Sequence, residues 1–504
     1  MAKKSKKMKS CQGYMTVYLS LTLAVLLSLC LSMIEGVRSN AIILESEIAS
    51  DIAVNSLLAE YNRELMKQYN IFAIEDSYGG NNASLDNTDA HLVSYLNNNF
   101  SANHFLGAFL NYRDFLGMEV ESAQTEGVLY LTDDNGAVFM RRAYEAVKDD
   151  VGMTLLSEIR DWATSIESSG LETMDMQGNM ALLEEQVEQA QIEASQQSED
   201  DNESDSDEDT MGEIIEVDSN DSTISPAASI LSSLRSGITN LVVDDLSTIS
   251  RKEMDTSALI SNRMNSGNIN VGNLALEDQS SIDDIAERMV FQEYLLRYMG
   301  QYNEEREDDA LSYQIEYIIA GRNNDRDNLD VILSRIFAIR FSADYIYIQS
   351  DEEKKEIAEI LGEAIGILTY TEELSDVYKE LYLLAWAETE ALYDVKCILA
   401  GNRINLFKDE DHWHTSFLLV SDDREYSGDG EGLSYTDYLR IFMTLLSKDR
   451  LVARAMDIVE SDVRLTPGNA GFRMDACIDT IQVFINIQST FGYSYSFRLK
   501  RKYE

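Results

Sequence analysis

The side chains of this chain that could carry out chemistry are its histidines, cysteines and carboxylates. The chain has four histidines and four cysteines. His412 and His414 are close neighbours, but two histidines without a third donor are a weak sign of a metal site. No histidine and cysteine form a recognisable nucleophile and base pair. The sequence therefore predicts no catalytic residue, no cofactor and no metal site, and leaves dispersed carboxylate pairs, as in glycoside cleavage, as the enzymatic alternative.

Two acidic stretches have some of the features of calcium sites. In the first stretch, four acids fall at the first, third, fifth and twelfth positions of an EF-hand loop: Asp205, Asp207, Asp209 and Glu216. Thr210 stands at the sixth position, where the sharp turn requires glycine, so a solvated linker is the preferred interpretation. The second stretch surrounds Gly428 and Gly430 and offers four carboxylates: Asp422, Asp423, Asp429 and Glu431. A plain acidic loop is preferred there, with calcium binding as the alternative.

The net charge of the chain limits which kinds of molecule it can bind. It contains 89 acidic and 41 basic residues, for a formal net charge of −48. Such a chain is repelled by the phosphates of nucleic acid, which excludes nucleic acid as a partner. Residues 161–234 contain no lysine or arginine. Because self-repulsion and few apolar residues leave little to offset the entropy of ordering, the sequence predicts a disordered acidic linker at residues 189–224.

A charge-free run at residues 14–34 follows a short tail with five lysines. At about 1.5 Å per residue its 21 positions span roughly 31 Å, the thickness of a bilayer core. The run is long for a cleaved signal and has no A-x-A site, and Cys30 follows Leu29 rather than the small residue of a lipoprotein anchor. We therefore expect a single-pass anchor in the cell membrane. The lysines place the N-terminus in the cytoplasm and the C-terminal domain outside.

One side of the predicted membrane helix carries small and hydroxyl side chains at every fourth position: Thr16, Ser20, Ala24 and Ser28. Helices in lipid associate through such residues, so this face is predicted to contact another membrane protein. The alternative is that small and hydroxyl residues are simply frequent in membrane helices.

The helical pattern continues beyond the membrane through residues 41–69, where neither glycine nor proline occurs. The sequence predicts one helix of about 55 residues that runs from the membrane into the outer domain. Its apolar side chains form a stripe: Leu44, Ile48, Ile52, Val54, Leu57, Leu58, Tyr61, Leu65 and Tyr69. Packing in the core is the preferred role of this stripe, and a free interaction surface is the alternative.

The predicted fold class is α+β and mainly helical, with a small antiparallel sheet. Residues 477–488 and 492–500 largely alternate between apolar and polar, which predicts a C-terminal hairpin, with an earlier strand near Val128 as a candidate for the same sheet. The predicted order is a basic tail at 1–13, the membrane helix at 14–34, a membrane-proximal helical or α+β region at 35–188, the acidic linker at 189–224 and an α+β domain at 225–504. Pairing of Cys397 with Cys477 is left open.

Several short runs resemble a family of membrane-anchored proteins of Gram-positive anaerobes. They are GYMTVYLSL at 13–21, IEGVR at 34–38, LAEYNRELMKQYNIFAI at 58–74, IEYIIAG at 315–321, LAWAE at 384–388 with the Asp394-Val395 pair, LSYTDYLR at 433–440, LTPG at 465–468 and FRMD at 472–475. The family has no assigned activity, and its members tend to be encoded with tight-adherence (Tad, or Flp-type) pilus machinery.

The resemblance implies a non-enzymatic extracellular component of such a pilus or its secretion apparatus, with other membrane proteins of that apparatus as partners and no small-molecule substrate. The alternatives are an anchored cell-surface enzyme and a calcium-dependent adhesin. Gly13 between a basic leader and an apolar helix is also how type IV prepilins begin. Those carry a glutamate where this chain has Tyr18, so processing at Gly13 is left open.

Overall fold

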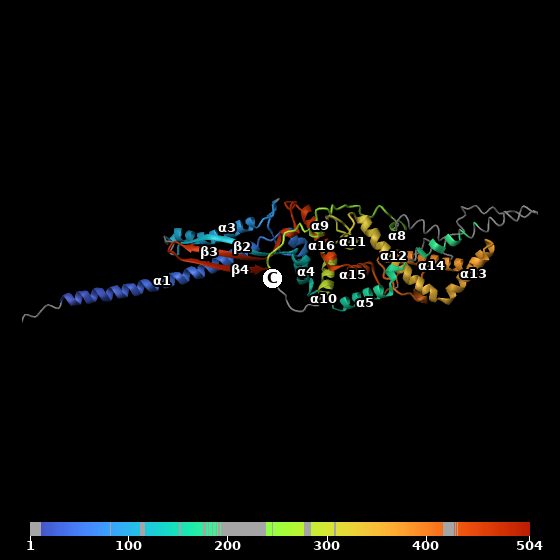
Figure 1. Ribbon diagram of the computed structural model, residues 1–504, viewed down its shortest axis with the longest axis horizontal. Helices are drawn as coiled ribbons and strands as arrows, with labels where there is room; N and C mark the ends of the chain where they lie inside the picture. Colours follow the sequence, from blue (N-terminus) through green and yellow to red (C-terminus); the bar gives the residue numbers. More distant parts are fainter. Residues whose placement is uncertain are drawn as a thin grey trace, which may run out of the picture. The chain divides into compact units, whose positions relative to one another are not determined.

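The structure is a computed structural model of the whole chain (Figure 1). It describes residues 12–80, 82–110, 116–150, 153–174, 238–243, 245–276, 284–306, 309–416 and 432–503, with isolated positions between 178 and 192 and at 428 and 430. The chain divides into two compact units. Unit 1 comprises Met1–Val138, Ile269–Asp278 and Thr466–Glu504, and unit 2 comprises Phe139–Asn268 and Gln279–Leu465.

This division differs from the sequence-based one, because unit 1 takes segments from both ends of the chain. Most of the predicted acidic linker lies outside the described residues, so its disorder stays a prediction.

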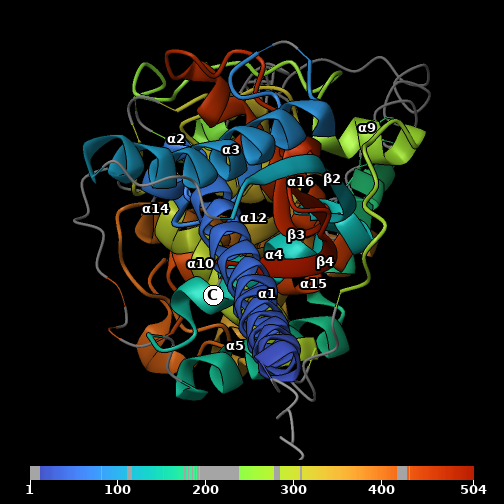
Figure 2. The same ribbon diagram turned by 90° about the vertical axis from the view of Figure 1, so that its left-hand side faces the viewer.

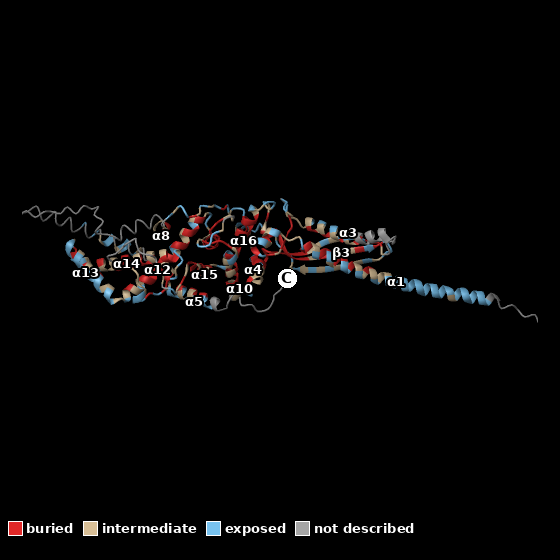
Figure 3. Cartoon of the chain, turned by 180° about the vertical axis from the view of Figure 1, so that it is seen from behind, coloured by how far each residue is buried: buried red, intermediate tan, exposed pale blue. Residues whose placement is uncertain are grey.

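Unit 1 begins with α1 (Gln12–Leu58), a single helix of 47 residues that continues through Gly36. Its N-terminal half is apolar and exposed (Figure 3), and this is the one described helix that is long and apolar enough to cross a membrane. The predicted continuation to Tyr69 is wrong, because α1 ends at Leu58 and a separate helix, α2 (Arg63–Tyr69), follows. The Asn62 side chain accepts hydrogen bonds from the backbone N–H groups of Glu64 and Leu65, which starts α2 as an independent helix.

The predicted core stripe on α1 is also wrong in its first part. Leu44, Ile48 and Ile52 are 58%, 46% and 49% exposed. The helix instead buries another face, made largely of small residues that let it approach the rest of unit 1 closely: Ile42, Ser46, Ala49, Ser50, Ala53, Val54, Leu57 and Leu58. Hydrophobicity alone did not identify the core face here, because the small buried residues contribute little to an apolar pattern.

The sheet of unit 1 has four antiparallel strands: β1 (Ile74–Glu75), β2 (Met118–Tyr130), β3 (Cys477–Ser489) and β4 (Ser494–Lys502). β3 is central; it pairs with β2 along one edge and with β1 and β4 along the other. The predicted C-terminal hairpin is therefore confirmed, and so is the strand containing Val128. Gly492 forms the turn of the hairpin at a φ of 84°, in the left-handed region that favours glycine.

Alternation along β3 defines the core of unit 1. Its inward side chains are fully buried: Ile481, Val483, Ile485 and Ile487. They share one apolar cluster with residues of α1, such as Leu57, and with Leu92 and Leu96 of α3 (Leu85–Leu110). Figures 1 and 2 show α1 and α3 beside the strands. The sheet thus has one face covered by helices, as an α+β layer requires.

A turn separates β2 from the next helix. α4 (Asp133–Val147) opens with three left-handed residues: Asp134, Asn135 and Gly136. It ends at Val147, and α5 (Met153–Ser169) follows as a separate helix.

The regular elements described in unit 2 are all helices. Besides α5 and most of α4 it contains α8 (Thr239–Val242), α9 (Ile260–Ser266), α10 (Asp284–Tyr298), α11 (Gln314–Ala320), α12 (Asp325–Ser350), α13 (Glu352–Leu368), α14 (Ser375–Leu399), α15 (Tyr435–Leu445), α16 (Lys448–Leu465) and short 3-10 turns. Ser434 and Asp437 form a capping box at the start of α15. Long α12 and α14 pack against each other and position the site described next.

Candidate functional site

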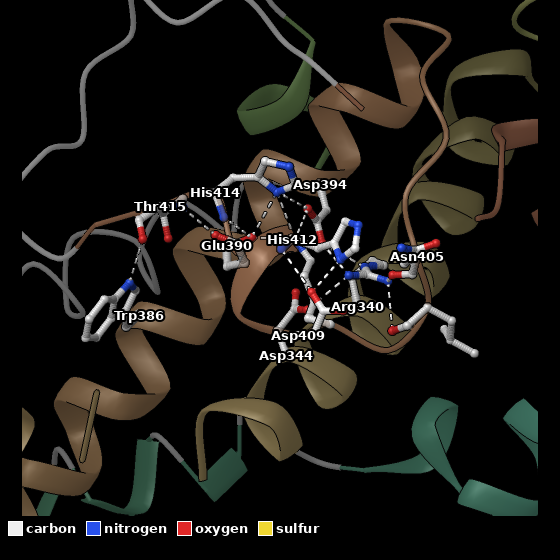
Figure 4. A network of polar contacts seen from close by, with 12 residues as sticks. Arg340, Asp344, Trp386, Glu390, Asp394, Asn405, Asp409, His412, His414 and Thr415 are labelled. Carbon is white, nitrogen blue, oxygen red and sulfur yellow. Dashed lines mark hydrogen bonds and ion pairs between the residues drawn. The ribbon is translucent and has the colours of Figure 1, made fainter. Parts of the chain in front are cut away.

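Charged side chains gather between α12 and α14 in unit 2 (Figure 4). Glu390 and Asp394 are one helical turn apart on α14 and therefore point to the same side, as Arg340 and Asp344 do on α12. The loop that follows α14 adds two further residues, Lys408 and His414. We call these six residues the buried charge network; all but His414 are fully buried, and His414 is 17% exposed.

The lysine of this network lies among three potential metal ligands. Glu390, Asp394 and His414 are the one group of histidine, cysteine or carboxylate ligands that the described residues bring within metal-binding distance of one another. The Lys408 ammonium is 2.7 Å from Asp394 Oδ1 and 3.1 Å from His414 Nδ1, and it also donates to Glu390. The backbone N–H groups of His414 and Thr415 donate to Glu390 at 2.9 and 2.8 Å.

The arginine completes the other half of the network. Arg340 donates to Asp394 Oδ2 from two of its nitrogens, at 2.9 and 2.5 Å, and to Asp344 Oδ1 at 3.0 Å. It also donates to the backbone carbonyls of Asn405 and Leu406, at 2.6 and 3.0 Å. One planar guanidinium therefore ties α12, α14 and the loop after α14 together.

The pKa values of the network residues reflect two opposing effects: burial disfavours the charged form, and hydrogen bonds and opposite charges favour it. Burial alone would raise the pKa of Glu390, but the hydrogen bonds of His414 and the charge of Lys408 hold it at about 2. Burial also lowers the pKa of Lys408, yet the surrounding carboxylates raise it above its ordinary value. Asp344 behaves differently: burial raises its pKa well above the ordinary value despite Arg340, and its Oδ2 has no hydrogen-bond partner among the described residues.

The raised pKa of Asp344 favours its protonated form. In that form the network is neutral, because two cations, Arg340 and Lys408, balance two carboxylates, Glu390 and Asp394. A divalent cation would have to displace the Lys408 ammonium and would add uncompensated charge to a buried site, which is costly. The arrangement thus acts as an internal ion network that joins two helices and a loop.

Cys397 lies on the same helix but offers no reactive thiol. It is fully buried, and burial raises its pKa to about 12, so the thiol stays protonated at neutral pH. Cys477 in unit 1 is also buried; it forms no disulfide with the described cysteines, and its thiol donates to the Arg473 carbonyl at 3.4 Å. The disulfide left open by the sequence is therefore absent from the structure.

The remaining residues that the sequence singled out are not among these six, although His412 lies beside them in Figure 4. His412 donates a hydrogen bond from Nδ1 to the carboxylate of Asp409. Both calcium candidates, the acids at 205–216 and those at 422–431, lie outside the described residues. The predicted membrane face is exposed along α1, where the Ser20 and Ser28 hydroxyls donate to Val17 and Val25 carbonyls at 2.9 Å. That face stays a prediction.

The buried charge network was not predicted from the sequence. Its local signal was a pair of helical acids four residues apart, Glu390 and Asp394, and such pairs are common on solvated helices. Only the fold shows that Arg340 approaches from α12, and that Lys408 and His414 approach from the loop.

The fold and this geometry define the class as a mainly helical α+β protein with a candidate N-terminal membrane span and a buried charge network. Residues 216–489 match the model of the Family of unknown function (DUF5702), which covers more than half of the chain, and the chain belongs to that family. No curated protein and no solved structure matches it. The charge network lies within the matched residues, whereas α1 precedes them.

Proposed function

We propose that this protein is a non-enzymatic, membrane-anchored extracellular component of a Tad/Flp-type pilus or its secretion apparatus, with a role in assembly or surface interaction. The observation that carries the proposal is the continuity of α1. Its first half is bare and apolar, and its second half packs on the sheet of unit 1. A helix of this kind holds a folded unit at a fixed distance from a bilayer, which suits a structural part.

The proposed orientation rests on charge. Five lysines precede the charge-free run, and Arg38 is the one basic residue close behind it, which favours a cytoplasmic N-terminus. Unit 1 contains 14 basic and 21 acidic residues, whereas unit 2 contains 27 and 68. The acidic surplus is thus concentrated in the unit that does not contain the anchor.

The charge network supports the non-enzymatic part of the proposal. Its carboxylates are occupied by Lys408, Arg340 and backbone donors, and Asp344 is fully buried. A general acid or base needs access to a reacting proton, and these groups lack it.

Membrane extraction tests the anchor. Arginines placed at Val25 and Leu27 each cost about 2.5–3.5 kcal/mol at the centre of a span. We expect the double variant V25R/L27R to leave the carbonate-resistant membrane fraction. Asn40→Arg is the matched control, because Asn40 is exposed on the same helix beyond the charge-free run, and this variant should stay in the membrane. Wild-type protein that alkaline carbonate removes from the membrane would contradict the anchor.

Piliation tests the assembly role. Leucines at Ser20 and Ala24 preserve hydrophobicity but block close approach of another helix, so we expect fewer Tad-type filaments at unchanged surface levels of the protein. Deletion of the whole gene should have at least as strong an effect. Normal filaments in the deletion strain, counted by electron microscopy, would contradict the role in assembly.

A further inference from the structure

A further exposed apolar stripe on α1 begins at the last residue of the predicted span, Ile34, and continues beyond it. Ile34, Val37, Leu44, Ile48 and Ile52 are between 46% and 66% exposed. Isolated exposed apolar residues are normal on protein surfaces, but a row of them along one helix marks an interaction site.

The spacing of this stripe is that of a coiled-coil seam. With Ile34 at position a of a heptad, positions a, d, a, d and a are Ile34, Val37, Ala41, Leu44 and Ile48. The regular seam from Ile34 to Ile48 is about 21 Å long at 1.5 Å per residue. Asp51 takes the next d position and pairs with Arg501 of its own chain, so the regular seam ends near Ile48.

Contacts on the opposite side of α1 hold the helix so that this stripe faces away from unit 1. The opposite side of α1 packs on unit 1 through Ala49 and Ala53, and the Ala49 carbonyl accepts a hydrogen bond from Asn99 at 3.2 Å. Nearer the membrane the Ser39 and Tyr495 hydroxyls are 2.9 Å apart, and Arg38 stacks over the Phe491 ring at 3.9 Å. Rotation of α1 that buried the stripe would break these contacts.

Lipid does not cover the stripe. Glu35, Arg38, Glu45, Glu47 and Asp51 surround it on the same turns of helix. Burying five charged groups in hydrocarbon costs far more than the apolar side chains gain. The stripe must therefore stand in water or against another protein.

We infer that the stripe pairs with the same stripe of a second copy of this chain, forming a parallel two-stranded coiled coil immediately outside the membrane. The inference rests on the proposed anchoring, because two copies in one bilayer are necessarily parallel and meet at the same height. Each a and d residue then faces its own counterpart, which is the arrangement that a self-complementary seam requires.

The charges beside the seam are compatible with this pairing. In a parallel pair, position g of one helix faces position e of the next heptad of its partner. The facing residues are Met33 with Arg38, Asn40 with Glu45, and Glu47 with Ile52, so no two carboxylates oppose each other. The modest charge of unit 1 adds little repulsion compared with that of unit 2.

Disulfide trapping in membranes tests the pairing with the full-length protein. In a background with Cys11→Ser and Cys30→Ser, single cysteines replace Leu44, Ile48 or Glu47; the buried Cys397 and Cys477 are kept. A disulfide needs Cα atoms within about 7 Å, so oxidation should give about tenfold more covalent dimer at positions 44 and 48 than at 47. Equal dimer at all three positions, or a covalent product with another protein instead, would overturn the inference.

A second measurement removes the seam instead of trapping it. In the variant L44E/I48E, two differently tagged copies should co-purify about tenfold less than in the wild type, because four carboxylates meet in the seam. The control I360E/I367E makes the same change at exposed isoleucines of α13, 59% and 61% exposed, and should leave co-purification unchanged. Unchanged hydrogen exchange in β3 shows that unit 1 stays folded.

Membrane extraction of the same samples separates the two proposals. Dimer trapped at 44 and 48 in protein that carbonate removes from membranes would support the pairing and contradict the anchor. Membrane-bound protein that gives no dimer would contradict the pairing and leave the anchor standing.

Discussion

The covered face of the sheet in unit 1 and the α12–α14 interface in unit 2 are both fully buried, yet they are built differently. The first is aliphatic along β3, as at Val483, Ile485 and Ile487. The second encloses two cations and three carboxyl groups. An aliphatic layer tolerates many compact arrangements, whereas a buried ion network is satisfied in one geometry only. The comparison suggests that the charges fix the relation of α12, α14 and the loop after α14 rather than add stability.

Removing the central cation should have the largest effect. Arg340→Met leaves Asp394 with one cation fewer, and breaking a buried pair typically costs about 3–5 kcal/mol. We expect faster amide hydrogen exchange in α12 and α14 of the detergent-solubilised full-length protein and no change in β3. Arg297→Met is the control, because the Arg297–Asp150 pair is exposed and should contribute nothing measurable. Equal effects of the two substitutions would show that the buried ion network matters no more than an exposed ion pair.

A cavity in the aliphatic layer should have the next largest effect. Ile485→Ala deletes part of a fully buried side chain and should destabilise unit 1 by about 3 kcal/mol. Exchange should rise in β2, β3 and β4 and stay constant in α12 and α14. If exchange rose equally in α14, the two units would not be independent in stability.

Glu316 of α11 differs from the carboxylates of the charge network, because it is buried with no cation beside it among the described residues. Burial raises its pKa to about 7, although Tyr302 and Tyr435 donate hydrogen bonds to Oε1 at 2.8 Å. Since the folded state holds the proton more tightly than the unfolded state, stability is full below pH 4.5 and falls as pH rises from about 4.5 to about 7. The expected loss is about 3 kcal/mol, because the pKa differs by roughly 2.5 between the two states and each unit corresponds to about 1.4 kcal/mol.

The variant Glu316→Gln isolates this effect because it keeps the shape without the proton. The difference in unfolding free energy between variant and wild type should grow in favour of the variant between pH 5 and pH 8. A difference that stayed constant with pH would show that Glu316 is not the titrating group.

The smallest effect should come from the protonated member of the network. If Asp344 is neutral, Asp344→Asn replaces it with a group of the same shape and charge and should change stability by less than about 1 kcal/mol. Asp394→Asn, the matched variant, removes a real charge and should cost several times more. Hydrogen exchange of α12 compares the two directly, and equal losses would mean that Asp344 is ionised.

The difference between the aliphatic sheet face and the buried charge network also explains which parts of the fold could be predicted from the sequence. Alternation in residues 477–500 predicted β3 and β4, because a strand with one buried face repeats every two residues. The start of α15 is marked by an equally local signal, Ser434 followed three residues later by the acid Asp437. The charge network joins residues up to 74 positions apart, Arg340 to His414. A periodic pattern within one element cannot predict a contact between residues so far apart in the sequence.

The errors on α1 have local causes. The side chain of Asn62 caps a new helix, α2, but the continuous apolar pattern of residues 41–69 favoured one unbroken helix. Leu44, Ile48 and Ile52 appeared to be core residues because periodicity shows which residues share a face. It does not show whether that face meets its own fold or a partner.

Protease protection in intact, wall-stripped cells tests the central claim most directly, namely that α1 anchors both units outside the membrane. External protease should digest both units and leave one small protected fragment that contains the N-terminal tail and the charge-free part of α1, identified by mass spectrometry. Protection of unit 1 and unit 2 from external protease, with digestion only after the membrane is opened, would contradict the account.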